Sequence, residues 1–293
     1  MNTIWVTGSK GQLGTELHLQ HKKLDNVLFH FTDIHELDLT NKQAVLDFTK
    51  KEKPQIIINC AGYTAVDKAE EEKELAFLLN KDIPVYLNEA ATTVGATLIH
   101  ISTDYVYNGN SEIPYQEDDP TDPQSVYGKS KLDGELEVLK NPKNLVIRTS
   151  WMYSAHGNNF VKTMLRLGKE RKELNVVADQ VGCPTSAADL ADALLKISKQ
   201  ILEGKNNTGG IYQYSNEGQC SWYEFAKAIM EITGIKCTIN PISTEQYPTP
   251  AKRPAYSVMS KEKISKVFGL YVPEWKVSLL KYFQTLISKM IFP

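Results

Sequence analysis

The chain has 293 residues, with 33 Lys plus Arg and 35 Asp plus Glu, which gives a formal net charge of −2. A balance this close to neutral argues against a general nucleic-acid binder or a polybasic membrane protein, so we expect neither kind of partner. The length favours one large domain with a smaller one beside it.

The N-terminus and the cysteines bear on location. The first eight residues lack the basic and apolar regions of a secretory signal, and no apolar run reaches the roughly 18 residues that cross a bilayer. The four cysteines lie far apart, without the CxxC spacing of a zinc site or redox pair. We therefore expect reduced thiols and a cytoplasmic protein.

Short apolar runs alternate with helical patterns over the first 150 residues. This alternation predicts a parallel sheet covered by helices on both faces, and right-handed crossovers make it a doubly wound Rossmann sheet. The expected strands are Ile4–Val6, Val27–Phe31, Ile56–Asn59, Thr97–Ile101 and Leu145–Arg148. The expected helices are Leu13–Gln20, Ala44–Lys51, Leu75–Gly95 and Val126–Leu139.

The alternation loosens after Trp151. We expect an NAD(P)-binding domain over 1–150 and a smaller, discontinuous α/β substrate lobe over 151–293, with a return of the chain to the main sheet near 175–212. The segment Asp179–Ala188 is expected to belong to that return. Short extended pieces separate the expected helices, which are Asn159–Gly168, Ala187–Leu202, Ser221–Thr233 and Val277–Met290.

A glycine-rich turn links the first expected strand to the first expected helix. Its glycines have the spacing GxxGxxG: Gly8 makes the tight turn, Gly11 lets the backbone approach a pyrophosphate, and Gly14 lets the helix pack closely on the strand. The helix N-terminus then attracts the anion. A purely structural turn is the alternative. The cofactor residues predicted here are Gly8, Lys10, Gly11, Gln12, Leu13 and Gly14.

Later segments add further cofactor contacts. Asp33 closes the second strand, about 20 residues past the glycines, where an acid accepts from the adenosine ribose and favours NAD over NADP, an effect that Lys10 partly offsets. An ordinary turn acid is the alternative for Asp33. For Asp38 the alternatives are an adenine contact and the N-cap region of the next helix. The residues predicted here are Asp33, Asp38, Leu39, Ala61, Gly62 and Tyr63.

Tyr127 and Lys131 form the pattern YxxxK, which places both side chains on one face of a helix. A nearby ammonium stabilises a phenolate and moves the tyrosine pKa toward neutrality, so the pair can exchange a proton with an alcohol or a carbonyl. Thr103 closes a strand where its hydroxyl can bond the same oxygen. Alone, the pattern is more often a surface pair, and Thr103 has the alternative of satisfying backbone.

Four motifs together resemble the extended short-chain dehydrogenase/reductase family: TGxxGxxG at 7–14, the NAG-type strand end at 59–62, STD at 102–104 and YxxxK at 127–131. The resemblance implies a nicotinamide-binding Rossmann domain and a C-terminal lobe that holds a nucleotide-sugar. Dehydratases of that superfamily carry two acids after the active-site threonine, whereas here Asp104 is followed by Tyr105. Reduction without elimination therefore fits this sequence better.

Finer motifs are similar to the dTDP-4-dehydrorhamnose reductase family. They include TAVDKAE at 64–70, STDYVY at 102–107, RTSW at 148–151, GNNF at 157–160 and DQVGCPT at 179–185. The resemblance implies an oxidoreductase that uses NADPH or NADH to reduce a 4-keto dTDP-sugar to dTDP-L-rhamnose. Another nucleotide-sugar reductase, an epimerase and a non-catalytic regulatory subunit stay open as alternatives.

The same resemblance implies roles for individual residues. Tyr127 would donate the proton, Lys131 would bind the nicotinamide ribose, and Thr103 would contact the sugar carbonyl. Trp151 has the alternative of a core residue, and Arg253 of an exposed loop charge. The implied substrate-binding residues are Thr103, Asp104, Tyr105, Trp151, Asn158, Asn159, Gln180 and Arg253.

Some members of the family dimerise around Mg²⁺. Glu16 matches the first acidic position, but the second cluster retains only Asp189. Because Mg²⁺ requires several oxygen ligands, we do not predict a Mg²⁺ site, although Glu16 stays open as a ligand, and we expect a monomer or a homodimer.

Overall fold

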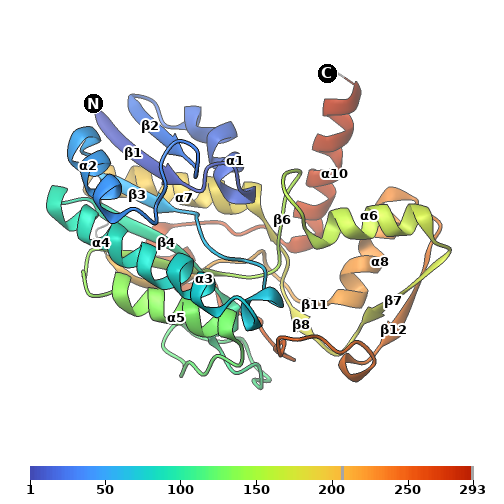
Figure 1. The fold of residues 1–293 in the computed structure, drawn as a ribbon. Coiled ribbons are helices and arrows are strands. Elements are labelled where there is room, and N and C mark those ends of the chain that lie inside the picture. The colour runs from blue at the N-terminus through green and yellow to red at the C-terminus, as the bar shows by residue number, and fades with distance from the viewer. Residues whose placement is uncertain (206–207, 292–293) are drawn as a thin grey trace.

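The computed structural model describes residues 1–205 and 208–291, with side chains to residue 286. Its main sheet has six parallel strands in the order β10-β5-β4-β3-β1-β2 (Figure 1). The expected doubly wound α/β class is confirmed. The strands are β1 (Asn2–Thr7), β2 (Val27–Thr32), β3 (Ile56–Asn59), β4 (Thr97–Thr103), β5 (Leu145–Thr149) and β10 (Gly210–Gln213).

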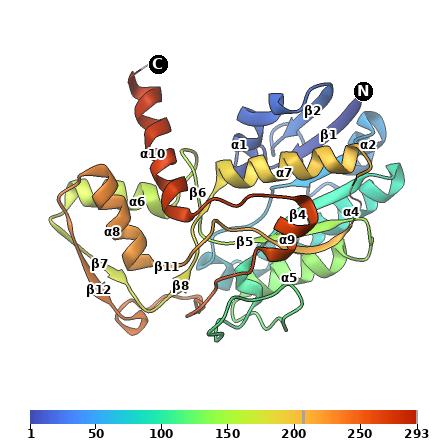
Figure 2. The ribbon, with the colours of Figure 1, turned by 180° about the vertical axis from the view of Figure 1, so that it is seen from behind.

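Burial on both faces explains the continuous apolar runs at the centres of β1, β3 and β5. Ile4 and Val6 of β1 face a core shared with α1 (Gln12–Gln20) and α7 (Ala187–Leu202). Trp5, between them, faces the opposite core. Figures 1 and 2 show the two helical layers. The second layer consists of α2 (Lys42–Glu52), α4 (Ile83–Val94) and α5 (Val126–Val138).

The expected helix Leu75–Gly95 contains three segments. It consists of α3 (Lys73–Phe77), a π-helical turn η3 (Leu78–Asp82) and α4, which ends at Gly95 with φ of +73°. The remaining short helices are η1 (His21–Lys23), η2 (Lys68–Glu70), η4 (Asp104–Val106), η5 (Thr244–Gln246) and α9 (Glu262–Phe268).

The second lobe packs around its own core, in which Val161, Phe225, Ile229 and Leu279 are fully buried. It lies beside the main sheet in both views (Figures 1 and 2). Its helices are α6 (Phe160–Glu170), α8 (Trp222–Thr233) and α10 (Trp275–Ile291). Its paired strands are β7 (Glu173–Val177) with β12 (Thr238–Ile242), β8 (Val181–Gly182) with β11 (Cys220–Ser221), and β6 (Met152–Tyr153) with β9 (Thr185–Ser186).

The expectation that Asp179–Ala188 joins the main sheet is wrong. Strands β8 and β9 of this segment each pair over two residues, with β11 and β6 outside the main sheet. Pro184 lies between them and has no N–H to extend a ladder. The chain returns to the main sheet through α7 and β10. The division at residue 150 stays a proposal, and residues 206–207 and 292–293, which fall within the expected return and lobe, lie outside the described residues.

Within the described part of the chain, no helix has the length and hydropathy needed to cross a membrane. All four cysteines are free thiols in the structure.

A buried ion pair fastens α5 to the main sheet. The Arg148 guanidinium of β5 donates to both carboxylate oxygens of Glu135 on α5, at distances from 2.7 to 3.2 Å. The two side chains are only 2% and 1% exposed. Arg148 also donates to the Tyr107 hydroxyl at 2.7 Å. Helix α5, which carries Tyr127 and Lys131, therefore depends on a desolvated charge pair.

Breaking this pair from one side should destabilise the protein strongly. Glu135→Ala leaves a buried, uncompensated guanidinium, so we expect a loss of about 3–5 kcal/mol in the free energy of unfolding. Urea denaturation measures this loss. The control is Glu137→Ala on the same helix, which removes an ion pair with Lys140 just beyond the helix end. This variant should change stability by less than about 1 kcal/mol. Equal losses in the two variants would contradict the assignment.

Candidate functional site

The glycine-rich turn presses against the end of β3. Gly8 has φ of +61°, and a Cβ there would lie 2.7 Å from the Ala61 nitrogen. A Cβ at Gly14 would lie 2.3 Å from the Gly8 carbonyl oxygen. Gly11 occupies the N-cap of α1 and supplies no side-chain cap. The first N–H groups of α1, at the positive end of its dipole, are therefore suited to an anion such as a pyrophosphate.

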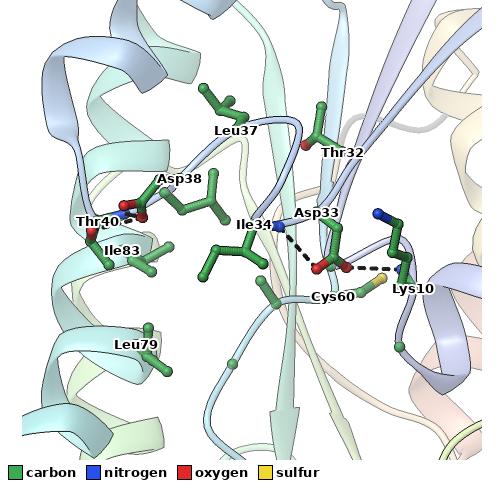
Figure 3. Close-up of a pocket in the computed structure, with 15 residues that line it drawn as sticks. Lys10, Thr32, Asp33, Ile34, Leu37, Asp38, Thr40, Cys60, Leu79 and Ile83 are labelled. Carbon is green, nitrogen blue, oxygen red and sulfur yellow. Dashed lines mark hydrogen bonds between the residues drawn. The ribbon is translucent and has the colours of Figure 1, made fainter.

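A cavity of about 460 Å³ extends from this turn across the carboxyl ends of β1, β2 and β3 (Figure 3). Such a position at the strand ends is where doubly wound sheets bind nucleotides. Eight of the expected cofactor residues line it: Gly8, Lys10, Gly11, Asp33, Asp38, Leu39, Ala61 and Gly62. Sequence reasoning missed six further lining residues before α4, namely Thr32, Ile34, Leu37, Thr40, Cys60 and Leu79, together with Ile83 of α4.

Asp33 and Asp38 are each held by local hydrogen bonds. The Asp33 carboxylate accepts from the backbone N–H of Lys10 and of Ile34, both at 2.9 Å (Figure 3). Asp38 accepts from the Thr40 hydroxyl at 2.7 Å and backbone N–H at 2.9 Å, and these bonds lower the pKa of its carboxyl. The N-cap of α2 is Asn41, so Asp38 does not serve as that cap.

Six other expected cofactor residues are not among those that line this cavity; Tyr127 and Lys131 belong to α5, and the remaining four support the turn and the strand end or lie near them. Leu13 is buried in the main core, and Gly14 packs on Ser9. The Tyr63 hydroxyl donates to Glu72. Gln12 directs its side chain toward the second lobe. The backbone N–H groups of Gln12 and Leu13 remain at the N-terminus of α1, so the predicted cofactor contacts of these residues stay predictions.

Helix α5 begins at the active centre. Ser125 caps it by accepting from the Gly128 N–H at 3.1 Å, which fixes Tyr127 in the first turn. The Tyr127 phenol lies close to the Thr103 hydroxyl at the end of β4. That hydroxyl donates to the Asp104 carboxylate at 3.0 Å and accepts from the Tyr105 backbone N–H at 3.2 Å. Lys131, one turn further, donates to the Ile101 carbonyl oxygen and lies beside Gly62 at the cavity wall. The structure thus brings together the three expected catalytic residues.

Burial controls the protonation of this centre. It raises the pKa of Tyr127 to about 12, a shift that the nearby Thr103 hydroxyl opposes. It also lowers the pKa of Lys131 to about 8. The expectation of a tyrosine pKa moved toward neutrality therefore does not hold here, because the buried phenolate is poorly solvated. A tyrosine with a raised pKa remains a proton donor at neutral pH.

Asn80, in the π-helical turn, was not anticipated from the sequence. It is fully buried, accepts from the Tyr63 N–H at 2.8 Å, and donates to the Tyr63 carbonyl at 3.1 Å and to the Ser130 hydroxyl at 3.0 Å. It thereby joins the end of β3 to the helix that carries Tyr127 and Lys131. No local sequence motif predicts these contacts of Asn80.

Aromatic and acidic side chains surround Tyr127. The Tyr105 ring lies edge-on to the Tyr127 ring, at 5.4 Å between centroids. Asp104 is buried beside Thr103, and this burial raises the pKa of the Asp104 carboxyl to about 6. Trp151 has a left-handed backbone, with φ of +45°, and stacks on Trp222 at 3.5 Å between ring centroids. The half-buried Trp151 thus also packs on the second core.

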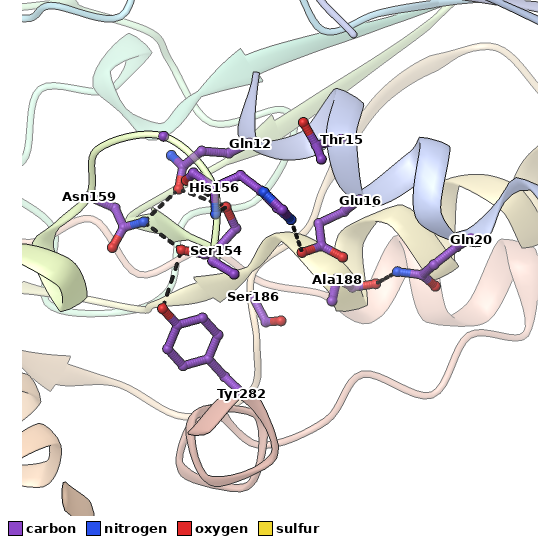
Figure 4. Close-up of polar contacts among 12 residues, drawn as sticks. Gln12, Thr15, Glu16, Gln20, Ser154, His156, Asn159, Ser186, Ala188 and Tyr282 are labelled. Carbon is purple, nitrogen blue, oxygen red and sulfur yellow. Dashed lines mark hydrogen bonds and ion pairs between the residues drawn. The ribbon is translucent and has the colours of Figure 1, made fainter. Parts of the chain in front are cut away.

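The expected polar substrate residues already have protein partners, apart from the exposed Asn158. Asn159 caps α6 and donates to Gln12 Oε1 at 2.9 Å (Figure 4). Gln180 donates to the Thr244 hydroxyl at 3.0 Å. Arg253 forms a two-pronged ion pair with Asp67, at 2.9 and 2.7 Å.

Comparison with known proteins agrees with this geometry. The family described as the RmlD substrate binding domain matches residues 1–288. The chain is 44% identical to the dTDP-4-dehydrorhamnose reductase of Sinorhizobium fredii, over 93% of this chain and 94% of the relative. The chain belongs to the dTDP-4-dehydrorhamnose reductase family.

Other relatives of this family member agree in sequence and in structure. The spore coat polysaccharide biosynthesis protein SpsK of Bacillus subtilis is 42% identical, over 97% of this chain and 98% of the relative. The crystal structure of the Clostridium acetobutylicum reductase has a TM-score of 0.91 at 45% identity, and covers 97% of this chain and 99% of that one. The Bacillus anthracis reductase, solved in complex with NADP, has a TM-score of 0.90 at 39% identity and the same coverage.

The acids linked to Mg²⁺ in some family members have other partners in this chain. Glu16 lies 4.0 Å from the His156 ring nitrogen (Figure 4). Asp189 accepts from Asn216 and from Ser278. Among the residues that the structure describes, no three His, Cys, Asp or Glu side chains gather in a group able to hold a metal ion.

Removing the Asn80 side chain should loosen the centre. Asn80→Ala leaves the buried N–H and C=O of Tyr63 without partners, so we expect a loss of about 2–4 kcal/mol in the free energy of unfolding. Urea denaturation of the variant measures this. Asn88→Ala, in the partly buried contacts of α4, is a comparison in the same helical layer and should lose less. An Asn80 variant as stable as the wild type would contradict the assignment.

Proposed function

We propose that this chain uses NADPH or NADH to reduce the 4-keto group of dTDP-4-dehydro-6-deoxy-L-mannose, giving dTDP-L-rhamnose in the last step of dTDP-rhamnose biosynthesis. The observation that carries the proposal is the convergence of Tyr127 and Thr103, with Lys131 beside Gly62, a residue that lines the adjoining cavity. Tyr105 stands where a dehydratase would need a second acid, so the site is built for reduction.

The residues fit a dinucleotide cofactor. The free N-terminus of α1 would hold the pyrophosphate, Asp33 the adenosine ribose, and Lys131 the nicotinamide ribose. The small residues Ala61 and Gly62 leave room for the nicotinamide half. When bound, the reduced cofactor supplies a hydride for the sugar carbonyl carbon.

The protein's own residues handle the proton. Thr103 donates a hydrogen bond to the carbonyl oxygen and polarises it. As negative charge develops on this oxygen, the Tyr127 hydroxyl transfers its proton there, and the product is an alcohol. The ammonium of Lys131 stabilises the phenolate that remains until solvent returns the proton.

The sugar would lie between Tyr105, Asp104 and Trp151. Arg253 lies close enough to Tyr105 for its charge to oppose the rise in the pKa of that phenol. We propose that it binds the substrate pyrophosphate through its fork of N–H groups. The neutral amides of Asn158, Asn159 and Gln180 stay candidates for the rest of the nucleotide-sugar. We place the protein in the cytoplasm, which its free thiols support, as a monomer or a homodimer.

The test is an assay of NADPH and NADH oxidation with the dTDP-4-keto-6-deoxy-L-sugar. Turnover with stoichiometric cofactor consumption is expected. No turnover with either cofactor would sink the proposal. Isomerisation of the sugar without net cofactor consumption would instead identify an epimerase.

Tyr127→Phe should lower kcat by about 10²–10⁴-fold, because the variant keeps the ring but loses the proton donor. Steady-state kinetics, with cofactor affinity measured separately, checks this. Tyr86→Phe, on the neighbouring helix α4 of the same layer, is a matched control and should retain the wild-type rate. A Tyr127 variant with near wild-type kcat would exclude the tyrosine as the acid.

The dependence of kcat/KM on pH should reveal the ionisation of Lys131. Lys131 is charged below its pKa of about 8 and neutral above it, so kcat/KM for NADPH should be constant up to that pH and then fall about tenfold per unit. Lys131→Arg keeps its charge and should remove this limb. A profile for the wild type that is flat from pH 7 to 10 would be inconsistent with the role.

A further inference from the structure

Three charged side chains form a network at the adenosine end of the cavity. Lys10 Nζ lies 2.8 Å from Glu36 Oε1. The other Glu36 oxygen accepts from the Asp33 backbone N–H at 3.0 Å, and Asp33 in turn accepts from the Lys10 backbone N–H at 2.9 Å. Glu36 is therefore held in place by backbone, and it holds the Lys10 ammonium.

This network sets the net charge of the side chains that face the adenosine ribose of a bound cofactor. Among the described residues that line the cavity, Lys10 is the one with a cationic side chain, whereas Asp33 and Asp38 are anionic. The hydrogen bond from Lys10 lowers the pKa of the Glu36 carboxyl, so Glu36 stays ionised at neutral pH. A second hollow, on the other side of the network, is lined by both Lys10 and Glu36.

NAD and NADP differ only at the 2′ position of this ribose. A free ribose hydroxyl donates to the Asp33 carboxylate, whereas a 2′-phosphate brings about −1.5 to −2 charges. That phosphate would meet the carboxylate of Asp33, and Lys10, the cation among the described lining residues, is already paired with Glu36.

We propose that Glu36 is a specificity-determining residue, which holds Lys10 away from a 2′-phosphate and makes this chain favour NAD(H) over NADP(H). The inference rests on the proposed function, since it assumes that the cavity binds the dinucleotide. Glu36 acts through Lys10, so it is a positioning residue. It sets the ratio of the two affinities, and both cofactors bind.

Equilibrium binding tests the proposal without any sugar. Titration calorimetry gives the Kd of NAD⁺ and of NADP⁺ for the wild type, Glu36→Gln, Lys10→Met and the double variant. An exposed ion pair is weak, so releasing Lys10 in Glu36→Gln should tighten NADP⁺ binding by about fivefold and change NAD⁺ binding by less than about twofold. The double variant should lose this gain, and Glu36→Asp should retain the wild-type ratio.

Glu203→Gln removes an exposed pair with Lys205 at the end of α7 and should leave both constants unchanged. A ratio that stays the same in Glu36→Gln would overturn the proposal, as would a parallel weakening of both cofactors or a gain that survives in the double variant. Failure of the wild type to bind either cofactor would overturn the proposed function as well, which separates the two failures.

Discussion

The active centre depends on how closely α5 approaches its neighbours. A Cβ on Gly128 would lie 2.3 Å from the Tyr105 carbonyl oxygen, and one on Gly134 would lie 2.0 Å from the Asn80 carbonyl oxygen. These two glycines let the helix lie against backbone on both sides of Lys131. The buried ion pair between Glu135 and Arg148 holds the same helix on β5. The glycine contacts and the ion pair together fix the position of α5. Tyr127 lies beside Thr103 because the whole helix is fixed.

Contacts between distant parts of the sequence join the cofactor turn to the second lobe. Gln12 follows the glycine that begins α1, and its side chain accepts from Asn159, the cap of α6 (Figure 4). Its backbone remains at the helix N-terminus, where an anion would bind. Arg253 and Asp67 make a second connection, near Tyr105. Residues of both lobes thus lie at the carboxyl ends of the strands, where the reduced cofactor and the sugar carbonyl would have to meet.

The sequence was most informative where burial or glycine packing leaves a local pattern. Strands covered on both faces are continuous apolar runs, and Gly8 and Gly14 are required by contacts that only glycine permits. The segment Asp179–Ala188 was misplaced because its two-residue strands are defined by partners far along the chain. The roles of Asn80 and of the Asp67 partner of Arg253 likewise depend on tertiary contacts, 17 to 186 residues apart, that no local spacing encodes.

The transfer of hydride to the sugar can be followed directly with deuterium. The protein is incubated with the dTDP-4-keto-6-deoxy-L-sugar and with cofactor deuterated at either the 4R or the 4S position of the nicotinamide, and the product is examined by NMR. One of the two cofactors should place deuterium at C4 of dTDP-L-rhamnose, in amounts equal to the cofactor oxidised. Product that carries no deuterium from either cofactor would contradict reduction at a site built around Thr103, Tyr127 and Lys131.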